Sequence, residues 1–228
     1  MFLTNCNKIL WRKMGLGAIV TFVLVLAGVF VFDKPLFMFL RQFNGWVCTL
    51  FDRVFGAEVW IIFASVLLIA LYVKKILKSD INFKDDKDKF NLIVALKNSV
   101  EAVRTSHAFL IFCSVVSAGI IVKILKIVIG RARPVFFEAL DMTGFYPPSL
   151  DWAFNSMPSG HTTVTFAGLV MIGMLAPRYK PWTWTLAIVV GLSRVMYGAH
   201  WPSDVLLGAF IGMVVADIVK FLLLGRQK

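Results

Sequence analysis

Residues 107–129 read HAFLIFCSVVSAGIIVKILKIVI, a run of 23 residues whose only lysines or arginines are Lys123 and Lys126. A helix needs about 20 predominantly apolar residues to cross the hydrocarbon core of a bilayer, so this run predicts a transmembrane helix. Five other apolar runs, some of them shorter, are expected to cross in the same way: Met14–Phe32, Glu58–Val73, Thr162–Ala176, Trp182–Gly198 and Ser203–Leu224. The sequence therefore predicts an all-α polytopic membrane protein, a bundle of six transmembrane helices.

The composition of the whole chain supports this fold class. Of its 228 residues, 59% are hydrophobic and 16% are charged, and the mean hydropathy is +0.79, which is unlike a soluble domain. The six predicted spans occupy most of the chain and leave no room for a separate soluble domain. We expect one integral membrane domain over residues 1–228, with a core that carries the polar motifs at 107–224.

The positions of the lysines and arginines indicate the orientation. Most of them precede the first run, separate the second from the third or the fourth from the fifth, or end the chain: Lys8, Arg12, Lys13, Lys74, Lys75, Lys78, Lys84, Lys87, Lys89, Lys97, Arg104, Arg178, Lys180, Arg226 and Lys228. The positive-inside rule makes these regions cytoplasmic, so both termini of a multi-pass protein of the cell (inner) membrane are expected inside. The net charge of +11 is then a topology signal. No nucleic-acid partner is expected, because no soluble module carries a basic face.

The segment between the first two runs has a different pattern. Apolar residues recur at helical spacing over about residues 37–56, with polar residues that include Arg41 and Asp52 on the other side. This pattern is typical of an amphipathic helix that lies in the membrane interface. Two roles remain open for it, a cap packed over the bundle and a part in admitting lipid.

Three polar segments interrupt the apolar runs: Lys126-x6-Arg133-Pro134, Pro158-Ser159-Gly160-His161 and Ser193-Arg194-x5-His200-x3-Asp204. With the termini inside, the third span ends outside, the fourth starts outside, the fifth ends outside and the sixth starts there. All three segments are therefore expected at one outer surface of the membrane. They supply three cations, two of the three histidines of the chain and a carboxylate, the groups needed to hold a phosphate and break a bond to it.

The spacing within the first segment has a physical rationale. Seven helical steps place Lys126 and Arg133 on nearly the same helix face, with Pro134 ending the helix. A cation inside a span is costly, so Lys126 is a functional candidate by default. Lys123 and Arg131 lie off this spacing, and we expect them to reach the membrane surface by snorkelling.

The other two segments suit an anion and a nucleophile. Ser159 and Gly160 open the fourth span, where free N–H groups and the positive end of the helix dipole attract phosphate. His200 lies one turn before Asp204, whose carboxylate can accept from one imidazole nitrogen and leave the other as a nucleophile. Arg194 adds a third cation with bidentate geometry for phosphate.

In this order and on these spans, the three segments resemble the three-part signature of the type 2 phosphatidic acid phosphatase superfamily, which includes membrane lipid phosphate phosphatases. The resemblance implies that His200 attacks phosphorus to form a phosphohistidine, that Asp204 orients it, and that His161 protonates the leaving oxygen and then activates water. It implies that five residues hold the phosphoryl oxygens: Lys126, Arg133, Ser159, Gly160 and Arg194. No metal or other cofactor is implied, because the fixed cations stabilise the developing charge.

Several alternatives stay open. A phosphotransferase of the same fold would pass the phosphoryl group to a second lipid, and a non-enzymatic anion transporter fits less well because the charges gather at one surface. A metal site of His161, His200 and Asp204 is disfavoured by the three cations beside it. The expected partners are the bilayer and a lipid phosphate or diphosphate, with phosphatidylglycerol phosphate, phosphatidic acid, undecaprenyl diphosphate and lipid A phosphate as candidates. The residues specify no oligomeric state.

Overall fold

A computed structural model describes residues 2–4, 8–80, 103 and 106–225 of the chain. Within these ranges the protein is all-helical and contains no strand, as the sequence predicts. The α-helices are α1 (Trp11–Ala27), α2 (Asp33–Arg41), α3 (Trp46–Val54), α4 (Ala57–Asp80), α6 (His107–Ile129), α7 (Pro134–Leu140), α8 (Gly160–Leu175), α9 (Lys180–Met196) and α10 (Pro202–Leu224). A π-helical turn, Gly28–Phe32, joins α1 to α2, and short 3-10 helices occur at Trp152–Phe154 and Pro177–Tyr179.

Four helical stretches in the described part of the chain are long and apolar enough to cross a membrane: Trp11–Arg41, Ala57–Lys75, His107–Ile129 and Pro202–Leu224. These are the helices of a membrane protein. The fourth and fifth predicted spans correspond to α8, which is apolar but shorter, and to α9 with its 17 residues. The count of six spans therefore stays a prediction. Much of the predicted cytoplasmic charge, at 84–97, Arg104, Arg226 and Lys228, lies outside the described residues.

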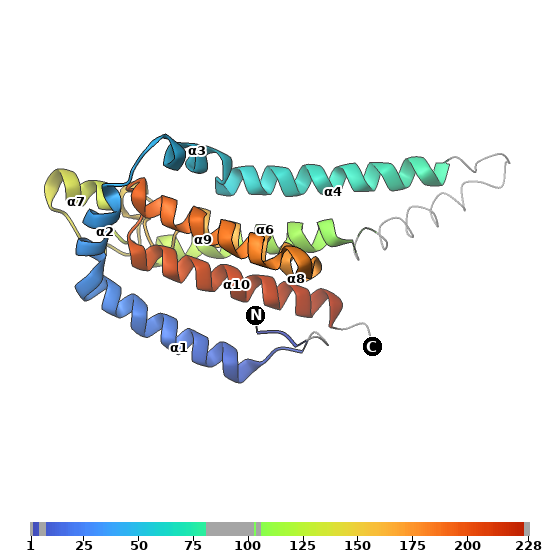
Figure 1. Cartoon of the computed structure of the whole chain (residues 1–228), viewed down its shortest axis with the longest axis horizontal. Coiled ribbons are helices and arrows are strands. Elements are labelled where there is room, and N and C mark those ends of the chain that lie inside the picture. Colours follow the sequence, from blue (N-terminus) through green and yellow to red (C-terminus); the bar gives the residue numbers. More distant parts are fainter. Residues whose placement is uncertain (1, 5–7, 81–102, 104–105, 226–228) are drawn as a thin grey trace.

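The central helix of the bundle is α8, which packs against α6, α9 and α10. Its side chains are buried on nearly all sides, as expected for an apolar helix enclosed by other helices. Gly212 of α10 permits the close approach of α10 to α8, because a Cβ at this position would collide with the carbonyl oxygen of Thr163. In Figure 1, α1 and α4 flank this core on opposite sides.

The segment predicted as one amphipathic helix over about 37–56 forms two helices instead. The first helical stretch continues through α2 to Arg41, and a new helix, α3, begins after Gly45. The break lies at Gln42–Gly45, where Gly45 has an extended backbone. Figure 1 shows α2, α3 and α7 at one end of the bundle, whereas the start of α1 and the end of α10 lie toward the opposite end. The placement of α3 in the membrane interface remains a prediction.

Candidate active site

The structure brings Lys126 and Arg133 together at the α7 end of the bundle, although they do not share a helix face. Helix α6 ends before Gly130, which adopts a left-handed conformation (φ 61°) and turns the chain. Pro134 then begins α7 as its first residue. The common helix face predicted from the spacing was therefore wrong. The two side chains converge instead on one backbone carbonyl, that of Asn155, with Lys126 Nζ at 2.5 Å and Arg133 Nη2 at 3.3 Å from its oxygen.

Arg133 is held by backbone carbonyls and an indole ring. Its Nε donates to the Trp152 carbonyl at 2.9 Å, Nη1 donates to the Ala199 carbonyl at 3.4 Å, and the guanidinium carbon lies 4.2 Å from the centroid of the Trp152 ring. Burial and the Arg194 charge lower the pKa of Arg133 to about 10, against the opposing effect of Asp204. Arg133 therefore remains a cation at neutral pH.

The N-terminus of α8 lies beside these cations. Ser159 precedes α8 and is fully buried; its N–H donates to the Asp204 carbonyl at 3.0 Å, and its Oγ accepts from Thr162 Oγ1 at 2.9 Å. Gly160 is the first helical residue, and a Cβ there would lie 3.6 Å from Lys126 Cε. The lysine side chain thus passes directly by the positive end of the helix dipole, which is suited to an anion.

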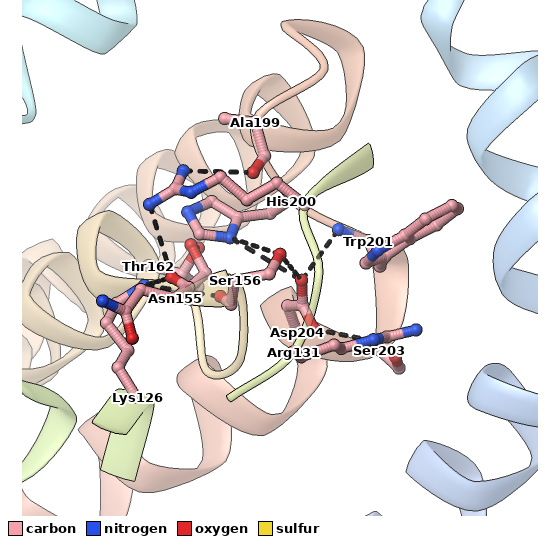
Figure 2. A network of polar contacts seen from close by, with 12 residues as sticks. Lys126, Arg131, Asn155, Ser156, Thr162, Ala199, His200, Trp201, Ser203 and Asp204 are labelled. Atoms are coloured by element: carbon pink, nitrogen blue, oxygen red, sulfur yellow. Dashed lines mark hydrogen bonds and ion pairs between the residues drawn. The ribbon is translucent and has the colours of Figure 1, made fainter. Parts of the chain in front are cut away.

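His200 and Asp204 lie side by side at the start of α10, in a network shown in Figure 2. Nδ1 of the imidazole is 3.7 Å from Asp204 Oδ2, beyond hydrogen-bond distance, and 3.5 Å from Ser156 Oγ. Ser156 Oγ in turn donates to Asp204 Oδ2 at 2.5 Å, and the Trp201 N–H donates to the same oxygen at 3.0 Å. Burial lowers the pKa of His200 well below its ordinary value, so the imidazole is neutral at neutral pH.

Arg131 is a buried structural cation, and its predicted snorkelling was wrong. The residue is 5% exposed, and its Nη1 donates to Asp204 Oδ1 at 2.6 Å while Nη2 donates to Asp33 Oδ2 at 2.6 Å. Burial acts to lower the pKa of Arg131, but the two carboxylates outweigh it and raise the pKa. Arg131 therefore bridges the start of α2 and the N-terminal end of α10.

A carboxylate from α3 lies against the remaining two predicted site residues. Asp52 Oδ1 accepts from Arg194 Nη1 at 2.5 Å and lies 3.5 Å from His161 Nε2. The Arg194 side chain is 3% exposed, and its Nε has no hydrogen-bond partner among the residues that the structure describes. The His161 side chain is 26% exposed and so is more open than His200.

Four residues of this arrangement were not predicted as site residues from the sequence: Asp33, Asp52, Arg131 and Ser156. Asp33 carried the best signal, because a carboxylate at the outer end of a predicted span requires a cation, and Arg131 lies at the outer end of another. Asp52 was assigned to the polar side of the amphipathic segment, but nothing in the sequence indicated that it contacts Arg194. Ser156 is recognisable only from its contacts.

Comparisons with known proteins show the family of the chain. Residues 107–226 match the profile of a protein family described as the PAP2 superfamily. A lipid A 1-phosphatase of Rhizobium johnstonii is 33% identical over 215 residues, which cover 89% of this chain and 81% of that protein. A lipid A 1-phosphatase of Rhizobium etli is 37% identical over 160 residues, covering 69% of this chain and 62% of the relative.

A more distant match is the undecaprenyl-diphosphatase of Sulfolobus acidocaldarius, 33% identical over 104 residues, or 43% of this chain and 47% of that protein. No solved structure matches the chain.

Proposed function

Because the chain belongs to the PAP2 superfamily and is a phosphatase of membrane lipid phosphates, we propose that it acts through a phosphohistidine on His200, without a metal ion, at the extracytoplasmic membrane face. The observation that carries this proposal is the meeting of three cations and two histidines at one end of the bundle, beside the N-terminus of α8. The residues proposed to bind phosphate are Lys126, Arg133, Ser159, Gly160 and Arg194.

The site contains hydrogen-bond donors for the phosphoryl oxygens of a substrate. Lys126 and Arg133 donate to backbone carbonyls, which an oxyanion can replace as the acceptor of charge-assisted hydrogen bonds. Arg194 keeps a buried Nε without a partner in the described structure. A buried donor without an acceptor is costly, so a bound phosphate would gain the full interaction.

The proposed reaction begins with the neutral imidazole of His200. Its Nδ1 faces Ser156 and Asp204, which leaves Nε2 to attack phosphorus as the bond to the lipid oxygen breaks. His161 gives its proton to that oxygen and then accepts one from the water that hydrolyses the phosphohistidine. The cations stabilise the charge on the phosphoryl oxygens in both transition states.

The contacts of Asp204 also support a reaction without a metal. One of its oxygens accepts from Arg131, and the other accepts from Ser156 and from the Trp201 N–H. A divalent ion would have to displace these donors beside three further cations, which is electrostatically unfavourable.

The substrate is proposed from the relatives that cover most of the chain. Both Rhizobium proteins are lipid A 1-phosphatases, so the 1-phosphate of lipid A is the first substrate to test. The undecaprenyl-diphosphatase makes a polyprenyl diphosphate the second, followed by phosphatidylglycerol phosphate and phosphatidic acid. We also infer that the whole chain, 1–228, forms one domain whose termini are cytoplasmic.

Purified protein given this panel of lipids should release free phosphate at an unchanged rate in excess EDTA. Loss of activity on chelation, with recovery on adding one divalent ion, would refute the metal-free mechanism. Phosphate recovered on a second lipid instead of in solution would make the enzyme a phosphotransferase. In intact cells, a reporter fused after Lys228 checks the orientation, and it should lie in the cytoplasm.

Asp52 gives a second prediction, because it competes with phosphate for Arg194. Replacing it with asparagine removes the negative charge at 2.5 Å from Arg194 Nη1, so KM and the inhibition constant of inorganic phosphate should fall about fivefold. Glu138→Gln is the matched control, since Glu138 pairs with Arg41 and its side chain is 36% exposed. An equal fall in both variants would mean a general charge effect, and no fall in Asp52→Asn would mean that Asp52 does not oppose phosphate.

A further inference from the structure

The first helical stretch places a buried carboxylate, that of Asp33, beside the start of α10. Asp33 is 2% exposed, and it follows directly on the π-helical turn Gly28–Phe32. A π turn holds one more residue than an α turn and so re-aims the side chains that follow it. The contact is close, because a Cβ on Gly28 would lie 2.8 Å from Ser203 Cβ. The α1–α2 junction is therefore shaped to pack on α10.

Asp33 caps α10 from outside that helix. Its Oδ1 accepts from the Ser203 N–H at 2.9 Å, and Oδ2 accepts from Ser203 Oγ. Ser203 is the second residue of α10, so its N–H is one of the four at the helix start without an intrahelical acceptor. A residue of the N-terminal part of the chain thus fixes the helix end that carries Asp204.

Arg131 continues this chain of contacts to the reacting group. Its Nη2 binds Asp33 at 2.6 Å, and its Nη1 binds both Ser203 Oγ at 2.7 Å and Asp204 Oδ1 at 2.6 Å. The guanidinium carbon also lies 5.4 Å from the centroid of the Trp201 ring, which limits its movement. Arg131 thus fixes Oδ1 of Asp204, and together with the donors to Oδ2 it sets where Oδ2 lies relative to His200.

The position of Oδ2 matters because its distance from His200 Nδ1, 3.7 Å, is just beyond a hydrogen bond. A small displacement of Asp204 either closes or opens that contact, and so changes the orientation of the imidazole. We propose that Asp33 and Arg131 are positioning residues for the phosphatase reaction, acting through Asp204 on His200. Asp33 lies outside residues 107–226, the part that matches the family, so this positioning role extends the site to the first helical stretch.

This inference rests on the proposed role of His200, and its test compares turnover with phosphate binding. We expect Arg131→Met to lower kcat about 100-fold and Asp33→Asn about tenfold, the range typical of residues that orient a reacting group. KM and the inhibition constant of inorganic phosphate should stay within about twofold, because the phosphate-binding cations are untouched. Arg131→Lys should recover part of kcat. Arg133→Met is the contrasting variant and should raise the inhibition constant of phosphate.

Removing Arg131 alone leaves Asp33 and Asp204 buried without their cation, so the single variant is at risk of not folding. The double variant Asp33→Asn/Arg131→Met removes one of these two buried charges, and Asp204 keeps its hydrogen bonds from Ser156 Oγ and the Trp201 N–H, so this variant should fold while keeping the low kcat. Thr165→Val is the stability control, because it removes a buried hydrogen bond to Trp60 Nε1 of 3.0 Å elsewhere in the bundle. It should lower the melting temperature in detergent without lowering kcat.

Three results separate the outcomes. Wild-type kcat in Asp33→Asn and in the double variant would overturn the inference. A kcat loss matched by an equal weakening of phosphate binding, or by the loss seen in an equally destabilised Thr165→Val, would also overturn it, in favour of a structural role. Activity that survives His200→Ala would instead refute the proposed mechanism itself.

Discussion

Replacing His200 with alanine should lower phosphate release from the lipid substrate by about four orders of magnitude or more, the scale on which the loss of a nucleophile acts. The His200 side chain is 3% exposed and lies against Ser156 and Asp204, and alanine has no group that can attack phosphorus from this position. The measurement is free phosphate from lipid A or a polyprenyl diphosphate. Binding of inorganic phosphate should persist, because Lys126, Arg133 and Arg194 remain.

The third histidine of the chain provides the matched control. His107 is exposed and begins α6, about 30 Å along that helix from Lys126. His107→Ala should therefore keep full activity. If His200→Ala turns over at a rate near that of His107→Ala, a phosphohistidine on His200 is not an intermediate.

Long, apolar elements could be predicted from the sequence because their length and composition are local properties. The predicted third span, His107–Ile129, is α6 to the residue, and the sixth differs from α10 by one residue. His200 and Asp204 could also be paired from the sequence, since they lie only four positions apart. The prediction that the three motifs meet at one end of the bundle rested on the topology of the predicted spans. It did not rest on any contact that the sequence indicates.

Other features depend on contacts between distant residues, and the sequence did not reveal them. Asp33 binds partners 98 and 170 residues away, and no local pattern marks such a pair. Lys126 and Arg133 were predicted to converge because a seven-residue spacing places two side chains on one helix face. That reason holds only while the helix continues. Here the helix ends at Gly130, and the carbonyl of Asn155, from a separate loop, accepts hydrogen bonds from both cations.

The different roles proposed for the two histidines fit their surroundings. His200 is enclosed, beside a carboxylate that accepts three hydrogen bonds, as a fixed nucleophile requires. His161, the second residue of α8, is more exposed, and Asp52 Oδ1 lies 3.5 Å from its Nε2. A group that exchanges protons first with a departing lipid and then with water needs this access. The two residues should therefore respond differently when the leaving group of the substrate is changed.

His161→Ala should lower lipid phosphate hydrolysis by about 10²- to 10⁴-fold, the usual contribution of a general acid and base. With an aryl phosphate whose leaving group departs without a proton, formation of the phosphohistidine should be far less impaired. The second step, which needs His161 to activate water, stays slow. The variant should therefore give a burst of one phenol per enzyme and accumulate phosphate on His200.

The trapped species is checked by its chemistry, because phosphohistidine is labile in acid and stable in base, unlike a phosphoserine. Adding His200→Ala to the His161→Ala variant should abolish both the burst and the labelled protein. Asp52→Asn should show no burst, since both histidines remain and each turnover is completed. An equal loss with the lipid and the aryl phosphate, without a burst, would leave His161 as a phosphate-binding residue and assign the proton transfers to another group. The dependence on leaving group thus tests the role of His161 separately from that of the nucleophile.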